Sequence, residues 1–107
     1  MQGAGWLTTE ELWWTPEGRL WTHAPSTYKI PAVSDCPTDL RVDFWDGDNI
    51  EETVYRSKAV GEPPLMHGLA VFFAIKDAVA STRNTPGPVP LVAPATPEAI
   101  LRALGPQ

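Results

Sequence analysis

The feature that most restricts the fold of this chain is one long apolar helix. Residues from Pro64 to about Thr82 are rich in Ala, Leu and Met, and a proline suits a first helical turn. Apolar residues occupy more than one stripe of this helix, and its polar cover comes chiefly from Lys76, Asp77 and the last turn. Such a helix needs other structure on most of its surface. Because the rest of a 107-residue chain is too small to enclose it, we expect a piece of a larger domain.

Short elements are predicted before this helix. Residues 1–12 have the pattern of a helix end, and residues 12–22 predict a β-hairpin. Pro16 and Gly18 stand at the second and fourth positions of its turn, where a type I turn favours them. Prolines at 25, 31 and 37 then exclude a helix and allow only extended backbone or an edge strand.

The next pattern is that of a strand. Residues 40–45 alternate apolar with polar side chains up to Phe44, as a half-buried strand does. We therefore expect hairpin and extended strands over 12–45, a loop over 56–64, and a helix over 64–83.

The last part of the chain, 84–107, is expected to be a linker and a short helix. Thr96 and Pro97 provide the cap and the first position of a helix over 98–104. The predicted fold class is α+β, with hairpin and extended strands packed against one long buried helix and a short C-terminal helix.

Composition excludes several classes of function. A net charge of −5 without a Lys/Arg cluster argues against nucleic acid or an anionic membrane as the main partner. Cys36 is the only cysteine, so no disulfide forms within the chain, and with His23 and His67 it makes too small a set for a zinc site. The longest apolar run, 69–75, is far shorter than a membrane span. We expect a soluble, cytoplasmic chain.

Glu62 is the candidate catalytic residue. It precedes Pro63, which excludes helical backbone at Glu62 and places it just outside the long helix, where the helix dipole favours negative charge. Gly61 beside it leaves space for a ligand, and Lys58 offers a nearby cation. An ionised carboxylate held there suits a general base. Taken by itself, the pattern also describes a solvent-facing cap residue.

Six ordered motifs carry a resemblance that covers nearly the whole chain. They are QGAG at 2–5, TEEL at 9–12, PSTYKIP at 25–31, SKAVGEPP at 57–64, FFAIKDA at 72–78 and APATPE at 93–98. In this order they resemble the closing segment of the molybdopterin-binding subunit of the xanthine dehydrogenase family. The string SKAVGEPP is specific by itself.

The resemblance implies a role for each residue of this loop. Glu62 is implied to be the base that deprotonates a hydroxyl on molybdenum, which then attacks an electron-poor carbon of a purine such as hypoxanthine or xanthine. Lys58, Ala59, Val60 and Gly61 match the loop that passes the pterin and the metal. The metal would be held by the pterin dithiolene, so no protein side chain is predicted as a metal ligand.

The same resemblance implies the partners. They are the remainder of the molybdopterin subunit, and FAD and 2Fe-2S centres on other subunits or domains. Aldehyde oxidases share the glutamate, so the substrate stays open, as does the electron acceptor, NAD or oxygen. The isolated chain is expected to be inactive. A natural split product, a truncated reading frame and a cut fragment all fit its sequence, and a non-catalytic docking module of the same fold is the alternative function.

Other candidate residues have simpler explanations. The acidic stretch 46–51 departs from the calcium-loop spacing and is expected to be a solvated turn. His67 could be a ligand, but an exposed helix histidine is the simpler interpretation. Cys36 could be a nucleophile, but it has no nearby base in sequence. The five tryptophans, with Trp13 and Trp21 in the hairpin, could form a ligand platform, and packing is the simpler account.

Overall fold

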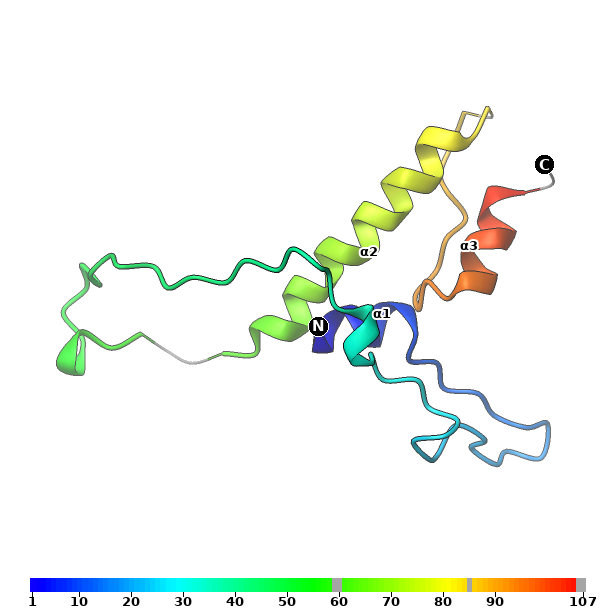
Figure 1. Ribbon diagram of the computed structural model, residues 1–107, viewed down its shortest axis with the longest axis horizontal. Helices are drawn as coiled ribbons and strands as arrows, with labels where there is room; N and C mark the ends of the chain where they lie inside the picture. Colours follow the sequence, from blue (N-terminus) through cyan, green and yellow to red (C-terminus); the bar gives the residue numbers. More distant parts are fainter. Residues whose placement is uncertain (59–60, 85, 106–107) are drawn as a thin grey trace.

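Three α-helices and two short 3-10 turns make up the regular structure of the described residues. The computed structural model describes residues 1–58, 61–84 and 86–105. Its elements are α1 (Gln2–Thr8), η1 (Val33–Asp35), η2 (Val54–Arg56), α2 (Pro63–Thr82) and α3 (Pro97–Leu104). Figure 1 shows α2 as the central rod, with α1 and α3 beside it and a long open segment that leaves the helices on the opposite side.

The C-terminal helix forms where local signals predict it. Thr96 is the N-cap of α3, its Oγ1 accepts a hydrogen bond from the Ala99 N–H at 3.2 Å, and Pro97 is the first helical residue. The side-chain oxygen satisfies one of the N–H groups that the first helical turn leaves without a partner. The prediction of this helix is confirmed.

The helix α2 is also present as expected, but its surroundings differ from the prediction. Phe72 and Val79 are buried on one stripe, at 8% and 4% exposure, and contact α1, α3 and the segment before α3. Other large apolar side chains of α2 remain open to solvent, with Met66 65% and Phe73 57% exposed. The described residues cover one side of α2, so the long helix of the predicted fold class is not buried within this chain, which agrees with the expectation of a piece of a larger domain.

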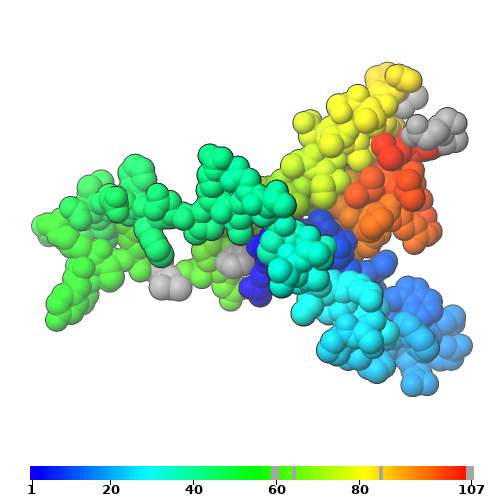
Figure 2. Space-filling view, viewed as in Figure 1, coloured from blue at the N-terminus to red at the C-terminus, as the bar shows by residue number. Residues whose placement is uncertain are grey.

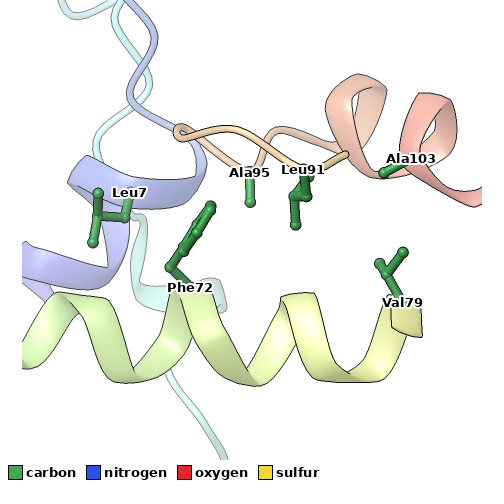
Figure 3. Close-up of a cluster of buried hydrophobic side chains, with 6 residues drawn as sticks. All are labelled: Leu7, Phe72, Val79, Leu91, Ala95 and Ala103. Atoms are coloured by element: carbon green, nitrogen blue, oxygen red, sulfur yellow. The ribbon is translucent and has the colours of Figure 1, made fainter. Parts of the chain in front are cut away.

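The core is small and lies between α2 and the elements on that one side. Its buried members are all apolar: Leu7, Phe72, Val79, Leu91, Ala95 and Ala103. Figure 3 shows Phe72 and Val79 rising from α2 toward Leu7 of α1, the segment that carries Leu91 and Ala95, and Ala103 of α3. The Ala95 N–H donates to the Leu7 carbonyl at 2.7 Å and ties that segment to the end of α1.

The contact between α1 and α2 depends on glycine. A Cβ at Gly68 would lie 2.5 Å from the carbonyl oxygen of Gly3 and 2.8 Å from its carbonyl carbon, distances that real Cβ atoms do not tolerate. Both glycines are buried. The helix backbones approach this closely only because neither residue has a side chain.

The hairpin forms as a turn with little strand structure. The Gly18 N–H donates to the Thr15 carbonyl at 2.9 Å, and Gly18 has φ +81°, which glycine adopts without strain. Trp14 and Leu20 form one isolated antiparallel bridge. The predicted turn is confirmed. The predicted strands are not, since a two-stranded ribbon is marginal without further strands to pack on.

Residues 38–58, here called the arm, depart most from the prediction. Where a half-buried strand was expected, Leu40, Val42 and Phe44 are 57%, 82% and 90% exposed, and no strand is assigned among the described residues. A strand requires a partner for its backbone groups, and the described part of the chain offers none to this segment. The α+β prediction is therefore confirmed only in its helices.

The chain is far more open than a compact protein of its size. Its radius of gyration is 18.4 Å, against about 13 Å for a compact domain of this length. Its accessible surface of 9238 Å² is about 3300 Å² above the roughly 5900 Å² of a compact 11.7 kDa protein. Figure 2 shows the reason, since the arm projects away from the helices as a separate lobe.

One helix among the described residues, within α2, is long and apolar enough to cross a membrane by length and composition alone. The stretch is Leu65–Thr82, and 17% of it is buried. The apolar run 69–75 is thus part of a longer apolar helix. One side of this helix packs on α1 and α3, and Lys76 and Asp77 lie within the stretch.

Candidate functional site

The candidate base stands where the arm joins α2. Glu62 is the N-cap residue of α2, with φ −110° and ψ 63°, and its carbonyl accepts a hydrogen bond from the Leu65 N–H at 3.2 Å. Pro63 is the first helical residue. The ring of Pro63 disfavours helical backbone at Glu62, so the helix begins directly after it. The predicted location, just outside the helix N-terminus, is confirmed.

The Glu62 side chain is not used to cap its own helix. It makes no side-chain cap hydrogen bond, and the residue is exposed. The first N–H groups of a helix carry partial positive charge, and this end of α2 therefore attracts negative charge. A carboxylate held here by backbone geometry, and open to its surroundings, has the freedom to accept a proton from another molecule.

The rest of the predicted loop is described only in part. Lys58 and Gly61 are exposed, and no described atom lies within 4 Å of the position that a Cβ on Gly61 would take. Ala59 and Val60 lie outside the described residues. The backbone at Gly61, the residue before Glu62, is therefore accessible to a ligand.

The donor set determines what kind of metal centre this site suits. The described residues contain no group of three His, Cys, Asp or Glu side chains that could hold a metal ion. A metal held through the sulfur ligands of a pterin needs no such group. The accessible backbone at Gly61 and the exposed Glu62 carboxylate leave room for such a group.

The alternative candidates do not join this site. His67 is exposed in the second turn of α2, and Cys36 is exposed in the segment after η1. The acidic stretch 46–51 is open to solvent, with Asn49 its only half-buried residue. The rings of Trp13 and Trp21 meet edge to face, with centroids 6.3 Å apart, which is a packing contact within the hairpin.

One polar contact was not foreseen from the sequence. The Tyr28 hydroxyl donates to Oε2 of Glu10 at 2.6 Å, and the Thr9 hydroxyl donates to the Lys29 carbonyl at 2.8 Å. The hydrogen bond to Glu10 raises the pKa of Tyr28, and burial and the Glu10 charge add to it. These bonds fasten residues 28–29 to the residues that follow α1. Since the paired residues are about 20 positions apart, no local pattern predicts them.

An apolar hollow at the hairpin does not include the candidate base. It has a volume of about 340 Å³, is widely open, and is lined by residues between Leu12 and Ile30, including His23 and Tyr28. Glu62 is not among its lining residues. The hollow and the loop at Glu62 are therefore separate features.

Comparison with known proteins gives the chain its relatives. The family described as "Molybdopterin cofactor-binding domain" matches residues 1–37. Xanthine dehydrogenase/oxidase of Gallus gallus is 48% identical over 106 residues, and that of Felis catus is 46% identical over 109 residues. Aldehyde oxidase 1 of Bos taurus is 43% identical over 106 residues. Each of these alignments covers 96% of this chain.

The same alignments show how small a part of the relatives this chain represents. It spans 8% of the length of each of these three proteins. The open surface of the chain and its one-sided core agree with this, because a segment of a larger domain leaves uncovered the faces that the rest of that domain packs against.

Proposed function

This chain belongs to the molybdenum hydroxylase family that includes xanthine dehydrogenase/oxidase, and we propose that it supplies the catalytic base, Glu62, to a purine-oxidising enzyme. The observation that carries this proposal is the position of Glu62. Its carboxylate stands at the N-terminus of α2, exposed and free of any capping bond, beside the accessible backbone of Gly61.

The residues of this chain have distinct parts in the proposed reaction. Molybdopterin, when bound, supplies a metal centre that takes up the electrons removed from the substrate carbon. Glu62 accepts a proton at a carboxylate oxygen from the hydroxyl group that then attacks the substrate carbon. Lys58, Ala59, Val60 and Gly61 line the cofactor, with Gly61 allowing close approach of the backbone. No step requires a metal ligand from this chain.

The remaining assignments are part of the same proposal. The partners are the rest of the molybdopterin subunit and the flavin and 2Fe-2S parts of the enzyme, and the complex is cytoplasmic. The isolated chain is inactive. Hypoxanthine or xanthine is the proposed substrate, and the 43% identity to Aldehyde oxidase 1 makes an aldehyde the second candidate. Native complexes isolated from the source cell test this directly, by assay with xanthine and with an aromatic aldehyde.

The base is tested by grafting. In what we call the grafted enzyme, this chain replaces the matching segment of the Gallus gallus protein, to which it is 48% identical. In that enzyme Glu62→Gln removes a proton acceptor without changing side-chain size, and we expect kcat to fall by about 100- to 10,000-fold. Molybdenum content and elution volume should stay unchanged, because the Glu62 side chain is exposed and makes no capping bond.

The matched control is Glu17→Gln. Glu17 is an exposed residue of the hairpin turn, far along the chain from the loop, and the same substitution there should leave kcat within about twofold. Equal turnover of the Glu62→Gln and unmodified grafted enzymes would remove Glu62 from the mechanism.

A further inference from the structure

The arm carries an apolar face that nothing in this chain covers. Leu40, Val42 and Phe44 alternate with Arg41 and Asp43, so in extended backbone the apolar side chains project to one face and the charged ones to the other. The three apolar residues are 57%, 82% and 90% exposed. Apolar and charged side chains alternate in this way in strands that bury one face. The pattern therefore indicates that the apolar face of the arm becomes buried.

The hydrogen bonds described for the arm lie within the arm itself. Its hydrogen bonds among the described residues are local, such as the bidentate pair from Arg41 to Asp39 at 2.9 and 2.7 Å and the bond from the Thr53 hydroxyl to the Ser57 carbonyl at 2.6 Å. None of the hydrogen bonds described for residues 39–58 reaches another part of the described chain. The Phe44 N–H donates to Oδ1 of Asp43 at 2.8 Å, and no other hydrogen bond is described for the backbone groups of residues 40–44, which are therefore available to a partner strand.

The turn at the end of the arm is strained in the chain by itself. Tyr55 and Arg56 have φ values of 51° and 54°, which residues with a side chain rarely adopt, and Tyr55 is 99% exposed. Strained backbone persists when surrounding contacts enforce it. The contacts described around Tyr55 and Arg56 are those of one short turn. They do not account for the strained backbone, so the packing of the undocked arm does not by itself stabilise this conformation.

The amount of uncovered surface indicates the kind of partner. The excess of about 3300 Å² is several times the roughly 800 Å² that each partner buries in a standard complex, and it belongs to the range of permanent interfaces. The chain represents 8% of the length of its relatives, so the structure that would cover this surface is the rest of the same protein.

We propose that residues 40–44 dock as an edge strand on the rest of the molybdopterin-binding domain, with Leu40, Val42 and Phe44 facing inward, and that this docking positions Glu62. Arg41 and Asp43 then face solvent. The first part stands on the alternation and exposure of the arm. The second part rests on the proposed function, because it makes the arm a positioning element for the base.

The connectivity explains how docking acts on Glu62. The arm ends at residue 58, four positions before Glu62, and α2 begins directly after Glu62. On the α2 side, the contacts with α1 and α3 hold the backbone. On the arm side, the hydrogen bonds described up to Lys58 are local, so docking of residues 40–44 supplies the longer-range contact.

Hydrogen exchange in the grafted enzyme tests the docking without measuring activity. The alternate amides of residues 40–44 that point to the neighbouring strand should exchange at least about 100-fold more slowly in the grafted enzyme than in the isolated chain, because an edge strand pairs on one side. Exchange that is equally fast in both would overturn the proposal.

Two neighbouring substitutions test which face is inward. Val42→Asp places a carboxylate on the inward face, and Arg41→Asp places the same group on the solvent face. We expect Val42→Asp to speed exchange of the arm and lower kcat by about tenfold or more, and Arg41→Asp to leave both within about twofold. Equal effects of the two variants would refute the inward and outward assignment.

A milder variant keeps the test informative where Val42→Asp prevents assembly. Val42→Thr has nearly the same shape, retains strand preference and adds one hydroxyl, so it should assemble and show a smaller change in the same direction. The two proposals fail separately. Protection of the arm together with normal turnover of Glu62→Gln would keep the docking and reject the base.

Discussion

The contact between Gly3 and Gly68 allows a prediction in which two physical effects oppose each other. By helix propensity alone, Gly68→Ala within α2 should stabilise the helix by about 1 kcal/mol. By the geometry of the contact, the new Cβ would stand 2.5 Å from the Gly3 carbonyl oxygen and 3.0 Å from its Cα. These are backbone atoms, which cannot rotate away as the end of a side chain can.

The steric effect should win. Overpacking of a tight contact costs about 1 to 3 kcal/mol, and the upper part of that range applies when both neighbours are backbone. After the gain in propensity, we expect the free energy of unfolding to fall by about 1 to 2 kcal/mol. With a urea dependence of about 2 kcal/mol per molar, the midpoint of urea unfolding should move down by about 0.5 to 1 M.

Far-ultraviolet circular dichroism of the chain in urea measures this change. Ala74→Gly, at an exposed position of the same helix, reports propensity alone and should cost about 1 kcal/mol. If propensity alone governed both positions, the two variants would shift the midpoint in opposite directions. A raised midpoint for Gly68→Ala would refute the close approach of α1 and α2.

Three further predictions concern local features. Thr96→Ala removes the N-cap acceptor of α3 and should cost about 1 kcal/mol in urea unfolding, whereas Thr96→Ser should retain most of the stability; equal losses would contradict the cap. Gly18→Ala places a side chain at φ +81° and should cost about 1 kcal/mol, measured as loss of the tryptophan signal in near-ultraviolet circular dichroism; an unchanged signal would argue against this turn. Tyr28 should ionise above the ordinary pKa of 10.0, and Glu10→Gln should lower its pKa toward that value in an ultraviolet titration with Tyr55→Phe as background. Because the pKa of Tyr28 is raised in the folded state, the stabilisation that this hydrogen bond gives the fold is complete below pH 10.0 and is lost as the pH rises through the folded pKa. If Glu10→Gln left the pKa of Tyr28 unchanged, the hydrogen bond would not be the cause of the raised pKa.

The features that could be predicted from the sequence are those that depend on neighbours in the chain. Thr96 and Pro97 begin α3 through one side-chain acceptor and one fixed φ, and both lie within three residues of the groups they act on. The same holds for the turn at Gly18. It also holds for Glu62, whose place outside α2 follows from Pro63, the next residue.

The predicted strand and the predicted enclosure of α2, which this chain does not show, depend on structure far away in the sequence. The alternation at Val42 and Phe44 describes a strand with one buried face, yet a strand exists only where another strand or sheet accepts its backbone groups. The apolar surface of α2 describes an enclosed helix, but only the stripe with Phe72 and Val79 meets a partner here. Both patterns record contacts that a segment of 107 residues does not itself contain.

The position of Glu62 between a fixed and a free segment has a consequence for catalysis. A general base must stand within hydrogen-bond reach of the proton it removes, so its backbone must be held on both sides. The chain holds one side, through α2 and its contacts with α1 and α3. The arm holds the other side only after it docks, and its local hydrogen bonds do not replace that contact. Under the proposed function and docking, assembly with the rest of the domain would complete the cofactor site and fix the direction of the Glu62 carboxylate, and a variant of the arm such as Val42→Asp should lower kcat without altering Glu62 itself.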